Sequence, residues 1–141
     1  MVKIIDGKKL AEEIKDKIVE DIIKLNGGHP EQALARPNLA IILVGEREDS
    51  KIYVARKEQA AKEVGIDTHL YKCDGGISEA ELLEMIKCLN EDESIDAILV
   101  QLPLPSTIDA DTIIMAVDPV KDVDGFHPDN LEKLLKSFNP P

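Results

Sequence analysis

The sequence has 141 residues, which is the size of one globular domain but short for an enzyme that must hold both a substrate and a large redox cofactor. Hydrophobic residues make up 43% of the chain and charged residues 32%, so the chain is too apolar to be disordered. The 28 acidic and 17 basic residues give a net charge of −11, which disfavours nucleic acid and anionic membranes as partners.

The first element is a helix that we expect from Lys8 to Leu25, because its apolar residues recur with helical spacing. We expect this apolar face to be buried; its members are Leu10, Ala11, Ile14, Ile18, Ile22 and Leu25. The segment Asn26-Gly27-Gly28 ends the helix. The unbroken apolar run from Leu39 to Gly45 then predicts a strand covered on both faces, which is typical of a parallel sheet.

The rest of the chain continues the alternation of helices and strands. Ser50 is the expected N-cap of a helix that ends at Gly65, and Ser78 with Glu81 forms the capping box of another. The other predicted elements are strands at Ile66–Cys73 and Ala97–Leu102 and helices at Asp109–Val117 and Pro128–Phe138. This order predicts a single α/β domain over residues 1–141, with three αβα layers and a mainly parallel sheet flanked by helices.

Cellular location is suggested by several negative features of the sequence. Cys73 and Cys88 fit no disulfide framework or metal pattern, so we expect free thiols in a reducing compartment. The first residues lack the apolar core of a signal peptide, and no apolar run is long enough to span a bilayer. The expected location is the cytoplasm.

Candidate site residues follow the predicted strands, where ligands bind in open α/β sheets. Tyr53 and Lys57 share one helix face, either as a core-edge ring with a solvated lysine or as an aromatic platform beside a general acid or base. Gln101 ends an apolar strand and either bonds the neighbouring backbone or orients a catalytic group or ligand. Leu102 and Leu104, held by two prolines, form a possible apolar wall.

The loop K-D-V-D-G-F-H-P carries two further candidates, Asp122 and Asp124. Either carboxylate could accept paired N–H bonds from a planar heterocycle, with Gly125 allowing close backbone approach, or both could serve the turn. The residues alone do not choose between the two. A metal site with His127 is disfavoured by the spacing, and the sequence has neither a G-x-G-x-x-G fingerprint nor a P-loop.

Four segments together give the sequence a family likeness: KIIDGKKLAEEI, LAIILVGEREDSKIYVARKEQAAKEVGI, AILVQLPLPSTID and DPVKDVDGFHPDN. In this order they cover nearly the whole chain. The chain resembles the N-terminal, folate-binding half of the bifunctional methylenetetrahydrofolate dehydrogenase/methenyltetrahydrofolate cyclohydrolase family. The combination of Y-V-x-x-K, V-Q-L-P-L-P and K-D-V-D-G-F-H-P is specific to it.

The resemblance implies roles for the candidate residues. Tyr53 stacks on the p-aminobenzoyl group of folate, Lys57 is the key catalytic group, and Gln101 hydrogen-bonds that lysine. Asp124, rather than Asp122, binds the pterin ring. The remaining substrate-binding residues are Leu102 and Pro103, and Ser50, at the start of the Tyr53 helix, is expected to be structural.

The implied reactions belong to one-carbon metabolism and feed purine biosynthesis. Methylenetetrahydrofolate gives a hydride to NADP or NAD, and the resulting methenyl cation is hydrolysed to 10-formyltetrahydrofolate without a metal. The family binds the nicotinamide cofactor in a Rossmann-type domain, for which this chain has no residues, so we expect no dehydrogenase activity from the chain alone. A homodimer is possible, because dimers are usual in the family.

The sequence departs from the family pattern near the last predicted helix. Glu132 occupies a position where the family usually has glycine, and FNPP replaces P-C-T-P. The chain is then either a segment of a longer protein or a natural short form. Two other functions therefore stay open beside the catalytic domain: a non-catalytic folate-binding module, and a structural or dimerisation remnant.

Overall fold

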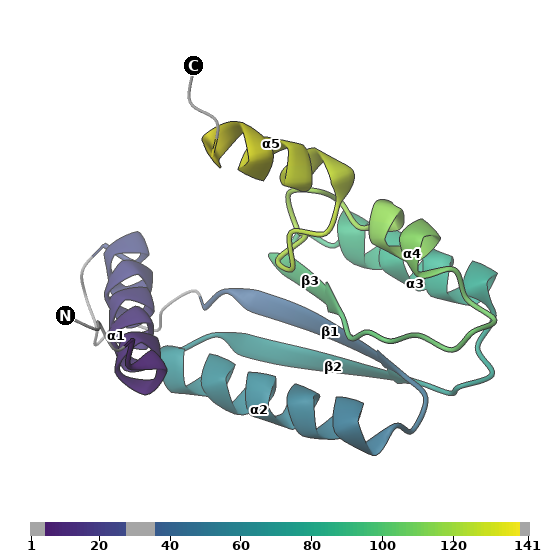
Figure 1. Ribbon diagram of the computed structural model, residues 1–141, viewed down its shortest axis with the longest axis horizontal. Coiled ribbons are helices and arrows are strands. Elements are labelled where there is room, and N and C mark those ends of the chain that lie inside the picture. Colours follow the sequence, from purple (N-terminus) through teal and green to yellow (C-terminus); the bar gives the residue numbers. More distant parts are fainter. Residues whose placement is uncertain (1–4, 28–35, 139–141) are drawn as a thin grey trace.

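The computed structural model describes residues 5–27 and 36–138, which form an alternating series of helices and strands (Figure 1). The elements are α1 (Gly7–Leu25), β1 (Asn38–Val44), α2 (Glu48–Val64), β2 (Asp67–Cys73), α3 (Glu79–Glu91), β3 (Ala97–Val100), α4 (Ala110–Ala116) and α5 (Pro128–Phe138). Each element lies within a few residues of its predicted place.

The three strands form a parallel sheet in the order β2-β1-β3, as the unbroken apolar run of β1 predicts. Helices α3 and α4 lie on one face of this sheet and α2 on the other, with α1 packed beside α2 (Figure 1). The predicted three-layer α/β class is thus confirmed. β3 ends two residues earlier than predicted, because Gln101 turns out of the ladder after its N–H has bonded to Ile42 O at 2.9 Å.

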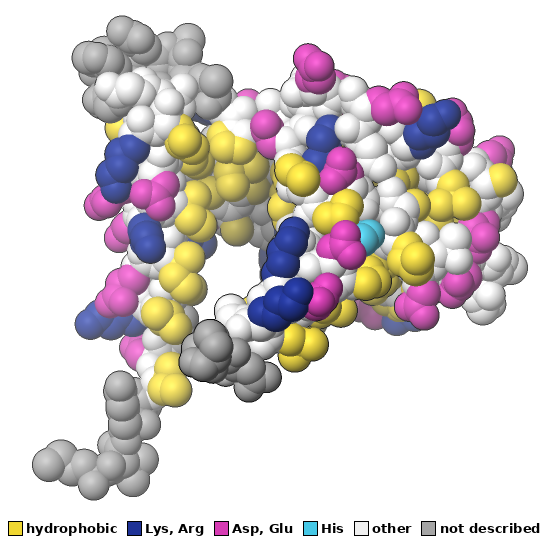
Figure 2. Space-filling model, turned by 90° about the horizontal axis from the view of Figure 1, so that it is seen from above, with side chains coloured by type: hydrophobic (Ala, Val, Ile, Leu, Met, Phe, Trp, Pro, Cys, Tyr) yellow, Lys and Arg dark blue, Asp and Glu magenta, His cyan; other side chains and the backbone are white. Residues whose placement is uncertain are grey.

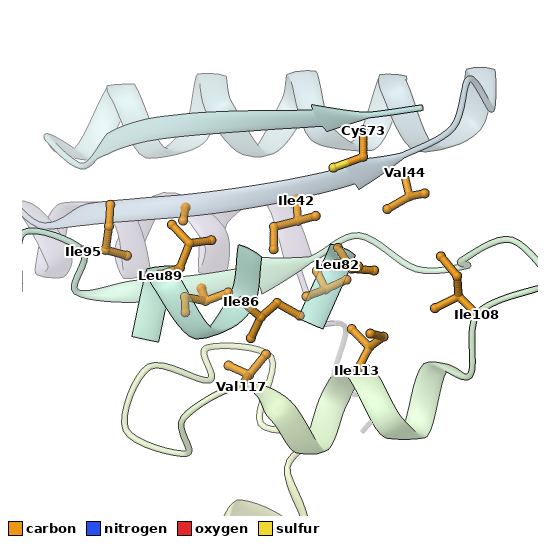
Figure 3. Close-up of a cluster of buried hydrophobic side chains, with 13 residues drawn as sticks. Ile42, Val44, Cys73, Leu82, Ile86, Leu89, Ile95, Ile108, Ile113 and Val117 are labelled. Carbon is orange, nitrogen blue, oxygen red and sulfur yellow. The ribbon is translucent and has the colours of Figure 1, made fainter. Parts of the chain in front are cut away.

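Two buried clusters occupy the two sides of the sheet. The larger lies between the sheet, α3 and α4, and Figure 3 shows its aliphatic side chains converging, among them Ile42, Leu82, Ile86 and Ile113. The smaller lies toward α2; its buried members are Ile41, Leu43, Val54 and Leu99. Since successive residues of β1 point to opposite faces, this one strand contributes to both clusters.

Local signals mark most of the helix ends. Ser78 and Glu81 form the predicted capping box of α3, and Gly65 ends α2 in the left-handed conformation with φ +86°. The prediction of Ser50 as the N-cap of α2 is wrong, because the helix begins at Glu48. Glu48 and Asp49 form its first turn, where the helix dipole favours carboxylates, and Ser50 lies inside the helix.

The predicted burial of the α1 face is also wrong, although the helix itself is confirmed. Only Ile22 is buried, while Leu10, Ile14 and Leu25 are exposed. Figure 2 shows hydrophobic side chains along the inner side of α1, at the left of the view, next to a hollow. α5 likewise buries no residue; its exposed apolar side chains are Leu131, Leu134, Leu135 and Phe138. Within the described ranges, no helix combines the length and apolarity that a membrane crossing requires.

The two cysteines are free thiols, as predicted, in different environments. Cys88 is exposed on α3, whereas Cys73 is buried at the end of β2 with its Sγ 3.9 Å from Met85 Sδ. Burial raises the pKa of the Cys73 thiol. Because the thiolate is the reactive form, Cys73 is suited to packing rather than to nucleophilic chemistry.

Candidate active site

The candidate site lies where the carboxyl ends of β1 and β3 face the start of α2. On α2, Tyr53 and Lys57 are one turn apart and point to the same side. Tyr53 is 58% exposed, so its ring is not part of the core edge and has a face open to a ligand. Lys57 is half-buried.

Gln101 connects the sheet to Lys57. Its Oε1 accepts a hydrogen bond from Lys57 Nζ at 3.1 Å, and its Nε2 donates to Leu102 O at 2.7 Å. The sequence left two alternatives for Gln101, a bond to the neighbouring backbone or the orientation of another group. The structure shows both: Nε2 bonds the backbone and Oε1 orients Lys57. Because both amide atoms have partners, the carboxamide is locked and Lys57 Nζ is held toward the pocket.

These residues line a pocket of about 270 Å³, and its lining is Asp49, Ser50, Tyr53, Lys57, Gln101, Leu102 and Pro103. The Leu102–Pro103 peptide bond is cis. Five residues predicted for the site, from α2 and from the loop after β3, thus meet in one cavity. Charged and amide groups lie beside a ring and an apolar wall, an arrangement suited to a partly aromatic, polar small molecule.

Asp124 does not line this pocket but a neighbouring, much smaller cavity of about 20 Å³. That cavity is bounded by Asp122, Asp124 and Phe126 from the loop and by β3 and α4 side chains, and Leu102 belongs to both cavities. The pKa of the Asp124 carboxyl is raised, chiefly by desolvation and further by the charge of Asp122, while the charge of Lys57 acts to lower it. The charge of Lys57 thus acts on the Asp124 carboxyl, although the two residues line different cavities.

The two carboxylates of the loop differ in their partners. Asp122 accepts hydrogen bonds from the backbone and from Asn130, whereas Asp124 accepts none from any residue within 5–27 or 36–138. Asp124 is the carboxylate left available for a ligand. Within the same ranges, no three His, Cys, Asp or Glu side chains are grouped as a metal-binding set.

Asp49 and Ser50 are pocket residues that the sequence interpretation did not include among the site residues. Ser50 is only 3% exposed, yet it lines the pocket together with Tyr53 and Lys57. The residue spacing 50, 53 and 57 places all three on one helical face, and this was the available signal. Asp49 accepts two hydrogen bonds from Arg47, at 3.1 and 2.6 Å, and one from the Ser50 N–H, which lower its pKa to about 2.

The parallel sheet, the Lys57–Gln101 hydrogen bond and the pocket at the carboxyl ends of the strands are typical of an α/β domain with a small-molecule site. Comparison with known proteins gives the family. The family model of the tetrahydrofolate dehydrogenase/cyclohydrolase catalytic domain matches residues 5–124. The chain belongs to this family, as the motifs of its sequence imply.

Individual relatives agree with this assignment. The bifunctional protein FolD of Prochlorococcus marinus is 47% identical over all of this chain and 45% of its own length. The 5,10-methylenetetrahydrofolate dehydrogenase structure from the silkworm Bombyx mori matches with a TM-score of 0.86 and 43% identity, over 95% of this chain and 45% of that one. The Trypanosoma brucei N5,N10-methylenetetrahydrofolate dehydrogenase-cyclohydrolase, solved with NADP and an inhibitor, matches with a TM-score of 0.85 and 31% identity, over 99% and 46%.

This chain therefore spans about half the length of the curated relatives it matches.

Proposed function

We propose that this chain is a folate-binding catalytic domain that hydrolyses methenyltetrahydrofolate to 10-formyltetrahydrofolate. The observation that carries the proposal is the hydrogen bond from Lys57 Nζ to Gln101 Oε1, in a pocket that also contains the exposed ring of Tyr53. A lysine held by an amide beside a small cavity is suited to moving protons on a bound ligand. Tyr53 offers a face for the p-aminobenzoyl ring, and Leu102 and Pro103 offer an apolar wall.

The proposed chemistry assigns one proton path to Lys57. The substrate carbon is cationic and therefore open to attack by water, and the amine of Lys57 serves as the proton acceptor. As water attacks this carbon, its oxygen forms the new bond and one of its protons passes to Nζ. Breaking the carbon–nitrogen bond then opens the ring, and Lys57 returns a proton to the leaving nitrogen while the other proton of water goes to solvent.

The remaining residues bind and orient the substrate. Gln101 keeps Nζ in place through Oε1, and its own position is set by the bond to Leu102 O. The carboxylate of Asp124 matches the paired N–H donors of a pterin ring, because one carboxylate can accept two parallel hydrogen bonds. Leu102 borders both cavities and so lies between Asp124 and the pocket that contains Lys57.

The dehydrogenase reaction of the family requires a nicotinamide cofactor. The sequence holds no dinucleotide fingerprint, so we assign no cofactor-binding residue in this chain. NADP is present in the Trypanosoma brucei relative, of which this chain covers 46%. We propose that NADP, or NAD, binds the part of the family fold that this chain does not cover, and that the protein works without a metal in the cytoplasm. The net charge of −11 supports small molecules, rather than nucleic acid or membranes, as its partners.

Two measurements on the purified chain test the proposed function. The decay of methenyltetrahydrofolate absorbance, above the uncatalysed rate, reports hydrolysis, and a calorimetric titration with a folate analogue reports binding. Hydrolysis together with binding is the expected result. Binding without hydrolysis would instead identify a non-catalytic folate-binding module, and the absence of both would leave a structural or dimerisation role.

Replacing Asp124 with alanine is expected to weaken binding of the folate analogue about 10- to 100-fold, since a hydrogen bond to a charged group contributes about 1.5–3 kcal/mol. Because the pKa of Asp124 is raised, its ionised form is lost at a higher pH than for an ordinary aspartate. Binding to the wild-type chain should therefore weaken as the pH falls through that range, and the Asp124→Ala variant should show a flatter profile. Calorimetric titration across this pH range measures both effects.

The matched control is Asp111→Ala, which removes an exposed carboxylate on α4 outside both cavities. Its affinity should equal that of the wild-type chain. Equal affinities for the Asp124 variant and the wild type would rule out the assigned role of Asp124 in pterin binding.

A further inference from the structure

Asp122 is the centre of a hydrogen-bond cluster within its loop. Its Oδ1 accepts from the Gly125 N–H at 3.0 Å, and its Oδ2 accepts from the His127 N–H at 2.9 Å. Oδ2 also accepts from Asn130 Nδ2 at 3.0 Å. One half-buried carboxylate thus holds backbone groups that follow Asp124 and a side chain from the first turns of α5.

The same loop is attached to the rest of the fold on its other side. The Ile98 N–H donates to Lys121 O at 2.8 Å, and Asp122 forms a parallel bridge with Ile98 of β3. Lys121 Nζ caps the end of α3 by donating to Leu89 O and Asp92 O at 2.9 and 2.8 Å. The chain is therefore anchored to the sheet immediately before it reaches Asp124.

Asp124 lies between these two sets of anchors and has no hydrogen-bond partner of its own in the described part of the chain. The next residue, Gly125, has φ +69°, a conformation that disfavours other residues. The direction of the Asp124 side chain is consequently set by the backbone on either side of it. That backbone is held by Asp122 on the α5 side and by the β3 bridge on the other.

We propose that Asp122 is a positioning residue, with Asn130 as its partner, that fixes the loop so that the Asp124 carboxylate faces the substrate cavity. This inference rests on the proposed function, since it assigns Asp122 a role in presenting the pterin-binding group. Asp122 is engaged by its own loop and acts on the substrate only through Asp124. Asn130 completes the arrangement because its Nδ2 also donates to Pro119 O at 2.8 Å, which ties the start of the loop to α5.

The charges of the loop are consistent with this division of roles. Desolvation acts to raise the pKa of Asp122, but the hydrogen bonds from Asn130 and from the His127 and Gly125 N–H groups lower it overall. Asp122 therefore stays ionised and remains a good acceptor at neutral pH. The charge of Asp122 also raises the pKa of Asp124, so Asp122 disfavours ionisation of the carboxyl group that it positions.

The test is the steady-state kinetics of methenyltetrahydrofolate hydrolysis by Asp122→Asn, which keeps the shape of the side chain but removes its charge. We expect KM to rise about ten-fold, because a charge-assisted acceptor of the loop is lost, and kcat to stay unchanged, because Lys57 and Gln101 lie on other elements. Asn130→Ala should shift KM in the same direction. Asp129→Asn, which removes an exposed carboxylate beside these residues, is the control and should leave both constants unchanged.

The second readout is a double-mutant cycle with Asp124→Ala. If Asp122 acts through Asp124, adding Asp122→Asn to the Asp124→Ala chain should produce no further rise in KM or in the dissociation constant of the folate analogue. A full additional rise, or a loss confined to kcat, would overturn the inference. Thermal unfolding of each variant shows whether it has folded. If Asp122→Asn does not fold, Asn130→Ala, which leaves the Asp122 charge in place, is combined with Asp124→Ala in the same cycle.

Failure of the inference differs from failure of the proposed function. A wild-type chain that hydrolyses or binds folate while Asp122→Asn and Asn130→Ala match it contradicts the positioning role alone. A wild-type chain that does neither contradicts the proposed function, and the positioning role with it.

Discussion

Replacing Lys57 with methionine is expected to lower kcat for methenyltetrahydrofolate hydrolysis about 10²- to 10⁴-fold, the usual contribution of a positioned general acid or base. Methionine keeps the unbranched apolar stem but removes Nζ, and with it the hydrogen bond to Gln101 Oε1. The loss should appear in the chemical step rather than in binding, because Tyr53 and Asp124 are unchanged. Absorbance decay of the methenyl substrate measures kcat, and calorimetry with a folate analogue measures binding.

Lys62→Met is the matched control for this substitution. Lys62 is an exposed lysine of the same helix and lies outside the pocket that contains Lys57. The control should hydrolyse the substrate at the wild-type rate. Equal rates for Lys57→Met and the wild type would contradict the catalytic role of Lys57, whatever the outcome of the binding measurement.

Replacing Leu82 with alanine is expected to lower the free energy of unfolding by about 2–5 kcal/mol, the range for a buried leucine that leaves a cavity. Leu82 is 0% exposed and packs in the larger cluster between the sheet, α3 and α4 (Figure 3). Since small domains are stable by about 5–15 kcal/mol, this loss is a large part of the total. Urea unfolding followed by circular dichroism measures it.

The comparison variant is Leu135→Ala, which removes the same atoms from a side chain that is 65% exposed on α5. Its effect should stay within about 0.5 kcal/mol, as is usual for surface positions. Similar losses for the two variants would show that the larger cluster is not the stabilising core of the domain.

Most elements of the fold could be predicted because their signals are local. The unbroken apolar run of β1, the capping box at Ser78 and the glycine after α2 each reflect the immediate chain. Burial of the α1 face could not be predicted in this way. Helical periodicity shows that a face is apolar, but only tertiary packing decides what covers it. Among the described elements, α1 packs chiefly against α2, and this leaves most of its apolar face uncovered.

Contacts of the site between residues near one another in sequence could be predicted, whereas contacts between distant residues could not. Tyr53 and Lys57 share a face because they are four residues apart on a helix. The contact between Lys57 and Gln101 joins residues 44 apart in sequence, and no spacing rule predicts it. The residues alone did not separate Asp122 from Asp124, because their difference lies in hydrogen bonds that form only when the loop folds against α5.

The backbone hydrogen bond from the Gln101 N–H to Ile42 O has a consequence for the dynamics of the site. Ile42 lies on β1, which is paired on both sides, and central strands exchange their amide hydrogens only through the largest opening motions of a domain. The carboxamide that orients Lys57 is thus attached to the central strand, whose amides we expect to exchange slowest among the described residues. Local fluctuations that open the surface loops can then admit and release a ligand while the hydrogen bond between Lys57 and Gln101 stays in place.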